Sequence, residues 1–261
     1  MQVQFAKPHA APRSMRRRAF AASLALASLF ALGVSPLVVS SAAADGVTAE
    51  RPMLLAQASS SSETDAAANG DVTAPEASGK VDVEKLMAEQ ALPDVVIGDA
   101  NAPVTIVEYA SMTCSHCREF HESSYPQIKK DYIDTGKAKL IIREFPFDPR
   151  ALAAFMLARC AGDDAKRTAM VDVLFDQQPQ WAFSNQASAE LLKISRLAGM
   201  SEEQFKACLN DKELQKKVVD VQQAGEKEFG VNATPTFFVN GDKYSGALSA
   251  AQMGAVIDAH M

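Results

Sequence analysis

The chain has 261 residues, of which 48% are hydrophobic and 22% are charged, with 13 glycines, 12 prolines and 4 cysteines. These proportions are those of an ordinary globular protein, and they exclude collagen-like, fully disordered and disulfide-dense toxin classes. The formal net charge is −6, and the first 44 residues hold five basic residues and no acid, so 21 basic residues face 32 acidic ones in the remainder. An acidic balance of this size predicts no binding to nucleic acid or to an anionic membrane.

Residues 1–44 have the layout of a secretory signal peptide. Arg16, Arg17 and Arg18 end a basic stretch that runs into the apolar residues 19–39 and then into three alanines at 42–44. This order of basic, apolar and small residues is typical of a leader that is removed on export. An uncleaved membrane anchor is the alternative, because a helix of this length nearly crosses a hydrocarbon core.

Residues 45–93 are predicted to be a disordered linker that ends in a short helix. Between Gln57 and Lys80 there is almost no large apolar side chain whose burial could offset the entropy of ordering the segment. Residues 83–92 then have the spacing of a short amphipathic helix that Pro93 stops. Whether this helix docks on its own domain or binds a partner stays open.

A pair of closely spaced cysteines follows the first two predicted strands. The strands are the β-branched runs at residues 95–97 and 104–107. Cys114 and Cys117 then stand where strand character ends and a helix-compatible stretch begins, with Pro126 as a predicted kink. A CxxC motif at a strand-to-helix junction is typical of thioredoxin-like redox sites.

Cys114 is predicted to be the reactive cysteine of this pair. At the first turn of a helix its sulfur would face unpaired backbone amides and the positive end of the helix dipole, which lower the pKa of the thiol. A protonated His116 would add a positive charge nearby. Because a stabilised thiolate favours the reduced state, the pair should act as an oxidant. Cys117, one turn deeper and better shielded, is the predicted resolving thiol.

The same cysteines could serve two other kinds of site, for haem or for a metal ion. Arg118 follows Cys117, so the CxxCH sequence needed for haem attachment is absent. Cys114, His116, Cys117 and His121 offer thiolate and imidazole donors that suit copper(I) or zinc. The first three of these cannot easily all point inward from one helical turn, so we predict no metal site.

Residues 149–229 are predicted to be a helical domain inserted into the sheet-forming part of the chain, since their apolar residues recur at helical spacing. Cys160 and Cys208 both fall at predicted helix ends within it. An even cysteine count in an exported protein favours a structural disulfide between them. Two buried free thiols are the alternative.

The C-terminal part is predicted to contain a β-hairpin. Thr234 and Pro235 precede the apolar run at residues 236–239, and proline is tolerated at the start of a strand. Asn240 and Gly241 follow, and this pair is typical of a two-residue type I′ turn into a returning strand at residues 242–245.

From residue 92 to the C terminus, the chain resembles the DsbA-like branch of the thioredoxin superfamily, the secreted bacterial thiol-disulfide oxidoreductases. The resemblance rests on the block IGDANAPVTIVEYASMTCSHCREFH, the strand KAKLIIREFPF, the helical stretch and the block GVNATPTFFVNG. It implies a thioredoxin-like α/β fold with a central mixed sheet, built from residues 94–148 and 230–261 around the helical domain inserted at 149–229.

The same resemblance implies roles for three further residues. The Thr234–Pro235 bond is expected to be cis and to pack against the CxxC motif, where the backbone of Thr234 would pair with an extended substrate. Glu108 is expected to be the buried acid below the cysteines, where it could relay a proton to or from Cys117.

The predicted function is that of a periplasmic oxidase of protein thiols, which introduces disulfides into reduced or unfolded exported proteins through Cys114 and Cys117. No cofactor is expected. The resemblance implies that a membrane redox partner reoxidises the pair, and contact with the membrane would otherwise come only from an uncleaved leader. The alternatives are a disulfide isomerase or reductase of the same fold and a copper-binding module that uses the CSHC site.

Overall fold

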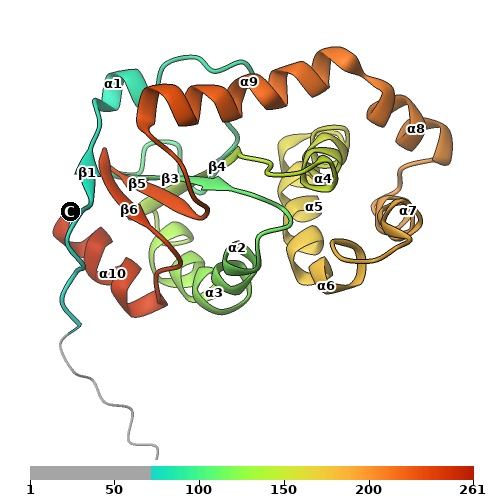
Figure 1. The fold of residues 1–261 in the computed structure, drawn as a ribbon. Coiled ribbons are helices and arrows are strands. Elements are labelled where there is room, and N and C mark those ends of the chain that lie inside the picture. The colour runs from blue at the N-terminus through green and yellow to red at the C-terminus, as the bar shows by residue number, and fades with distance from the viewer. Residues whose placement is uncertain (1–71) are drawn as a thin grey trace, which may run out of the picture. The chain divides into compact units, whose positions relative to one another are not determined.

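Residues 72–261 are described by the computed structural model of the chain. The predicted leader and most of the predicted linker lie outside the described residues. The described part contains a sheet of six strands and a set of helices that cover it or extend beside it (Figure 1).

The sheet is mixed, as predicted. Its strands are β1 (Gly79–Lys80), β2 (Val96–Ile97), β3 (Val104–Ala110), β4 (Ala138–Glu144), β5 (Thr236–Val239) and β6 (Asp242–Ser245). They are ordered β1-β6-β5-β3-β4-β2 across the sheet. Strands β3 and β4 are parallel and all other neighbours are antiparallel. The two outermost strands, β1 and β2, have only two residues each.

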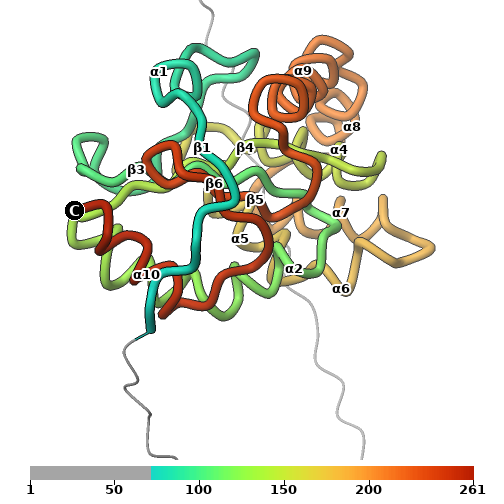
Figure 2. Tube along the Cα trace, turned by 60° about the vertical axis from the view of Figure 1, so that its left-hand side comes forward, coloured from blue at the N-terminus to red at the C-terminus, as the bar shows by residue number. Residues whose placement is uncertain are grey.

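Helices cover both faces of the central strands, and almost every residue of β3 and β4 is therefore buried. Helix α9 (Lys212–Phe229) lies along one face, and α10 (Ala250–Ala259) lies with the helices that follow the CxxC motif on the other (Figure 2). A Cβ atom at Gly225 of α9 would lie 2.6 Å from the Tyr109 ring of β3. Glycine at this position therefore lets α9 approach the sheet closely.

The helix after the CxxC motif continues through Pro126 by changing its hydrogen-bond pattern. Its segments are α2 (Ser115–Glu119), the π-helical η1 (Phe120–Ser124), α3 (Tyr125–Ile128) and the π-helical η2 (Lys129–Ile133). At the end of η1 the N–H of Tyr125 donates to the carbonyl of Phe120, five residues earlier. The expected kink at Pro126 is therefore a widened turn, since a proline has no N–H to contribute to an ordinary α-helix.

Residues 149–229, predicted as the helical insertion, form a run of helices. It contains α4 (Pro149–Arg159), α5 (Asp164–Asp176), α6 (Gln178–Trp181), α7 (Ala187–Leu197), α8 (Glu202–Asn210) and α9. Across residues 72–261 no helix combines the length and the apolar character that crossing a membrane requires.

The predicted disulfide between Cys160 and Cys208 is confirmed. It joins the C-terminal end of α4 to α8 with a Cα–Cα distance of 6.2 Å, across a sequence separation of 48 residues. The chain-entropy model gives a stabilisation of up to about 4 kcal/mol for closing a loop of this length. The bond therefore holds the two helices together without taking part in the CxxC site.

A buried ion cluster ties the insertion to the sheet. Oε1 of Glu144, the last residue of β4, accepts hydrogen bonds from Nε of Arg159 at 2.7 Å and from Nη2 of Arg167 at 3.1 Å. Arg167 also donates to the carbonyl of Ile142 at 2.8 Å, and Arg159 to that of Pro93 at 2.8 Å. Burial opposes ionisation of Glu144, but the attraction of the two guanidinium groups outweighs it and lowers the pKa of the carboxyl. The charged carboxylate thus holds α4 and α5 against β4.

The predicted linker ends earlier than the composition indicated. Gly79 and Lys80 form β1, which pairs with Lys243 and Asp242 of β6. The next residue continues the contact, because the N–H of Val81 donates to the carbonyl of Gly241 at 2.9 Å. The unpaired backbone of β6 orders this segment, and composition alone carries no information about such a partner.

The helix predicted at residues 83–92 is much shorter, since α1 covers only Val83–Leu86. Arg143 of β4 explains where it ends. Its Nη2 donates to the carbonyl of Leu86 at 2.7 Å, and its guanidinium binds both carboxylate oxygens of Asp94, at 2.9 and 2.7 Å. The chain leaves the helix to bring Asp94 to this buried arginine. The segment before Pro93 is thus docked on its own domain, which was one of its two open roles.

Candidate active site

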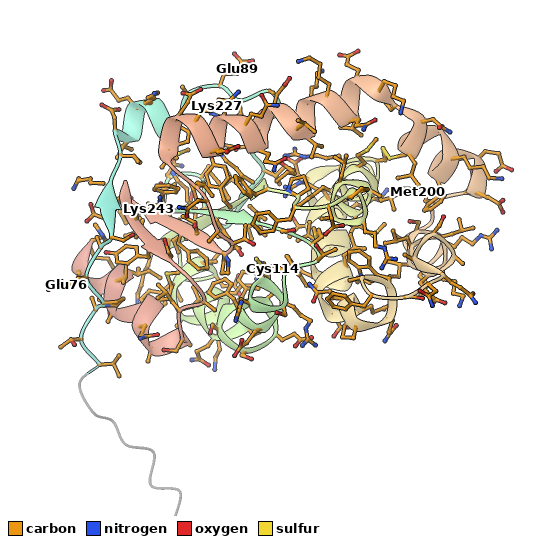
Figure 3. The ribbon with its side chains drawn as sticks, viewed as in Figure 1. Glu76, Glu89, Cys114, Met200, Lys227 and Lys243 are labelled. Atoms are coloured by element: carbon orange, nitrogen blue, oxygen red, sulfur yellow. A yellow bond between two sulfur atoms is a disulfide. The ribbon has the colours of Figure 1, made fainter. Side chains whose placement is uncertain are left out.

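Cys114 stands at the N-cap of α2, just beyond the end of β3. Figure 3 shows it between the sheet and the helical insertion. Gln178, at the start of α6, holds the loop in place by donating from Nε2 to the carbonyl of Met112 at 2.8 Å and to that of Cys114 at 2.9 Å. Cys114 is half-buried and Cys117 is fully buried, and both are free thiols. The structure therefore represents the reduced form, with one accessible and one shielded sulfur, as predicted.

The pKa of Cys114 is lowered to about 5. The largest cause is a hydrogen bond from the Cys117 thiol, which outweighs the opposing effect of burial, and the backbone N–H groups of Cys117 and His116 contribute further. As a thiol, Cys114 Sγ donates to the carbonyl of Thr234 at 3.3 Å. In the ionised form that bond is lost, because a thiolate has no proton to donate. The Thr234 hydroxyl, which has no hydrogen-bond partner in this structure, is then the group of Thr234 that can donate to the sulfur. At pH 7 the thiolate then exceeds the thiol roughly a hundredfold.

His116 contributes to the site through its backbone. The residue is exposed at the start of α2, and its backbone N–H, not its imidazole, is among the causes that lower the pKa of Cys114. An exposed imidazolium acts through water and is screened by salt. The positive charge expected from the ring of His116 stays a prediction.

Cys117 has the opposite electrostatic environment. Burial, first of all, raises its pKa well above the ordinary value, and the charges of Glu108 and Cys114 raise it further. Glu108 lies on β3 with no exposed surface, as the family resemblance implied and as strand position alone did not. Its Oε2 lies 3.0 Å from Nε2 of His121, which is itself buried. The two cysteines thus differ in the way that attacking and resolving thiols require.

The Thr234–Pro235 peptide bond is cis, as predicted. It lies beside the cysteines, since the carbonyl of Thr234 is the partner of Cys114 Sγ. The carbonyl of Pro235 accepts from the N–H of Gly246 at 2.9 Å, which fixes the loop against the end of β6. Pairing of the Thr234 backbone with an extended substrate stays a prediction.

The four donors considered for copper or zinc do not converge. His116 is exposed at the surface, whereas Nε2 of His121 lies 3.0 Å from Oε2 of Glu108 inside the protein. In the part of the chain from Val72 onward, no three His, Cys, Asp or Glu side chains lie together as a metal site would need. The geometry gives the copper-binding alternative no ligand set.

Two features of the site were missed in the sequence. Gln178 gave no signal, because a glutamine at a helix start has many surface roles and its partners lie 66 and 64 residues away. His121 was considered only as a metal ligand. A histidine on the helix that follows a CxxC motif could have been paired with the acid of the preceding strand once both were placed under the cysteines.

The causes of the low pKa predict how alkylation of Cys114 depends on pH. In reduced protein, the rate with iodoacetamide should rise through a midpoint near 5 and then level off, because only the thiolate reacts. In Cys117→Ala, which lacks the strongest hydrogen bond to the thiolate, the midpoint should move upward by at least about one unit. An unchanged midpoint in Cys117→Ala would show that the helix N-terminus alone ionises Cys114.

Comparison with known proteins identifies a family model and several relatives that this chain resembles. The family model described as Thioredoxin matches residues 90–259. A relative in Rickettsia conorii, provisionally named a protein-disulfide oxidoreductase, is 38% identical over 148 residues, which are 57% of this chain and 53% of the relative. One in Rickettsia felis, named in the same way, is 35% identical over 170 residues, or 63% of this chain and 59% of the relative. The chain thus spans a little over half the length of the curated relatives it matches.

Solved structures agree on the fold. The α-DsbA1 protein of Wolbachia pipientis is 33% identical, with a TM-score of 0.63, and the match covers 68% of this chain and 95% of that one. BdbD of Bacillus subtilis, at 22% identity and a TM-score of 0.58, shares the fold over 71% of this chain and 98% of its own. The match to α-DsbA1 includes nearly the whole of that protein.

Proposed function

The chain belongs to the thioredoxin family, in its DsbA-like branch, and from this premise we propose that it is an exported protein thiol-disulfide oxidoreductase that introduces disulfides into reduced client proteins. The observation that carries the proposal is the contrast within one CxxC motif. Cys114 is accessible with a pKa of about 5, whereas Cys117 is buried with a raised pKa.

The proposed reaction begins with the Cys114–Cys117 disulfide. A client thiolate attacks Sγ of Cys114, the bond between the two cysteines breaks, and Cys117 leaves as a thiolate that takes up a proton. A second client thiolate then attacks the client sulfur of the mixed disulfide, and Cys114 leaves as a stable thiolate. Two electrons pass from the client to the enzyme, and the client gains a disulfide. The low pKa of Cys114 drives the last step, because a thiol of lower pKa leaves faster.

Oxidation is the favoured direction because the reduced form gains the stability of the Cys114 thiolate. Several groups stabilise that anion, including the Cys117 thiol and two backbone amides, and the disulfide form has no charge for them to act on. A couple whose reduced form is stabilised has a higher potential. A membrane redox partner that removes electrons from Cys114 and Cys117 completes the proposed cycle, with no cofactor on this chain.

Export to the periplasm is part of the same proposal. It is supported by the leader-like residues 1–44 and by the Cys160–Cys208 disulfide, a bond of a kind that persists in oxidising compartments. Clients in such a compartment would be newly exported chains whose cysteines are still reduced.

The test of the proposal is the equilibrium potential of the Cys114–Cys117 couple in glutathione buffers. We expect it to lie closer to the roughly −120 mV of strong disulfide donors than to the roughly −270 mV of thioredoxin. The same preparation should oxidise a reduced, unfolded client in stoichiometric amounts. A potential near the thioredoxin value would support the reductase or isomerase alternative instead, and failure to oxidise any client would remove the oxidase proposal.

A further inference from the structure

His121 contacts the buried Glu108 and also lines a cavity between the helix that follows the CxxC motif and α5. Its Nε2 lies 3.0 Å from Oε2 of Glu108. Its ring is stacked on Phe175 of α5, with 4.2 Å between centroids and 14° between planes. Because two fixed neighbours hold the imidazole, one ring nitrogen is kept on Glu108, and the other, Nδ1, is buried and has no hydrogen-bond partner.

The chemistry of Cys117 requires a proton route at this place. Cys117 must gain a proton when the disulfide opens and lose it when the disulfide forms, yet its side chain has no exposed surface. Glu108 lies in the same buried region, where its charge helps to raise the pKa of Cys117, and the family resemblance gives it the role of exchanging that proton. However, Glu108 is also completely buried, and one of its oxygens faces His121. Glu108 alone therefore cannot exchange protons with solvent.

The cavity beside His121 offers the missing access. It has a volume of about 460 Å³ and lies between the helix that follows the CxxC motif and α5. Its titratable lining residues, besides His121, are Glu122, Tyr125, Lys129, Asp172 and Asp176. Burial raises the pKa of Asp172, and the neighbouring His121 and Lys129 oppose this rise. The rest of the lining is largely apolar, but water held beside these charged side chains can accept or supply protons.

We propose that His121 carries protons between Glu108 and this cavity, so that Cys117 can be protonated and deprotonated without becoming exposed. This inference rests on the proposed oxidoreductase function. His121 acts through Glu108 and does not touch the client. It is therefore a positioning and proton-carrying residue rather than one of the reacting groups.

The proton transfers balance in both directions. When a client thiolate opens the Cys114–Cys117 disulfide, the Cys117 thiolate takes the proton of the Glu108 carboxyl. Glu108 then takes a proton from Nε2 of His121, while Nδ1, which has no protein partner, accepts one from water that enters from the side of the cavity. Reoxidation runs the same transfers in reverse and restores the starting tautomer of the ring. An imidazole is suited to this because its two nitrogens can accept and release protons separately.

The test separates the step that needs Cys117 deprotonated from the step that does not. Reduced full-length protein is mixed with oxidised glutathione, samples are quenched in acid, and mass spectrometry follows first the mixed disulfide on Cys114 and then closure of the Cys114–Cys117 bond. In His121→Ala we expect closure to be at least about tenfold slower, as general acid-base catalysis contributes at least this much. Formation of the mixed disulfide should keep its wild-type rate.

Chemical rescue distinguishes proton transfer from a structural effect. His121→Ala leaves a space that adjoins the existing cavity, so added imidazole should speed its disulfide closure back toward the wild-type rate. The control is His260→Ala, which removes a histidine paired with Asp242 at the end of α10. It should close at the wild-type rate with no response to imidazole.

Wild-type closure in His121→Ala would overturn the proposal, and so would slow closure in folded protein that imidazole does not accelerate. If His121→Ala does not fold, His121→Gln carries the test, because glutamine can still donate to Glu108 but cannot pass a proton on. Slow closure with normal mixed-disulfide formation supports the relay, and normal closure rejects it. These rates use glutathione alone, so they remain informative even if no client protein is oxidised.

Discussion

Replacement of Cys114 with serine is expected to abolish oxidation of client thiols, with a loss of at least about a thousandfold that reaches the uncatalysed background. Serine keeps the size and polarity of the side chain but cannot share a disulfide with Cys117 or with a client. The measurement is the rate at which a reduced, unfolded protein gains disulfides when mixed with oxidised enzyme. Far-UV circular dichroism should be unchanged, because Cys114 is only half-buried.

The matched control removes the other pair of cysteines. Cys160→Ala with Cys208→Ala deletes both sulfurs of a disulfide that lies outside the CxxC site. At a temperature where it stays folded, this double variant should still oxidise the client. If instead Cys114→Ser retains activity and the double variant loses it, the reacting disulfide has been assigned to the wrong pair.

Replacement of Glu144 with leucine is expected to lower the free energy of unfolding by about 3–5 kcal/mol. The change leaves Arg159 and Arg167 buried without their carboxylate partner. Because the folded-state pKa of Glu144 is lowered, its contribution is present above the unfolded-state pKa and is lost as pH falls through the folded-state value. The difference between variant and wild type should therefore be full near neutral pH and shrink in acid. Urea unfolding of the oxidised protein at several pH values measures it.

A surface ion pair provides the comparison. Glu190 binds Lys193 one helical turn away at 2.8 Å, with both side chains in contact with water. Glu190→Leu removes the same charge and should change the free energy of unfolding by less than about 1 kcal/mol. Equal effects of Glu144→Leu and Glu190→Leu would mean that the buried cluster is not what holds the insertion on β4.

Much of the fold could be predicted because its signals are local. Asn240 and Gly241 both have positive φ, 45° and 91°, as a type I′ turn requires, and the pair alone predicted the hairpin. The ends of the N-terminal elements could not be predicted in this way. α1 stops where Arg143 binds the carbonyl of Leu86, and β1 forms because β6 offers it a partner. Both depend on residues more than 50 positions away, which no local pattern records.

The residues of the candidate site also fall into those that a local motif predicts and those that depend on distant contacts. Cys114, Cys117 and the Thr234–Pro235 bond belong to short motifs and were identified in the sequence. Glu108 was identified only through the family resemblance, because a central strand covered on both faces has no alternation that would mark a buried acid. The contact between His121 and Glu108 joins a helix to a strand, so the sequence contained both residues but no local pattern that would pair them.

The two short edge strands have a consequence for how this protein can handle the unfolded clients proposed for it. A reduced, unfolded client has exposed backbone N–H and C=O groups that can pair with the edge strand of a sheet and extend the sheet by further strands. In this protein both edge strands, Gly79–Lys80 and Val96–Ile97, have only two residues each. Such short edges offer too few hydrogen-bonding groups to pair with a long segment of another chain. We therefore expect clients not to aggregate along the edges of the sheet, which leaves the loop around Pro235 as the predicted place for a client to bind and be released.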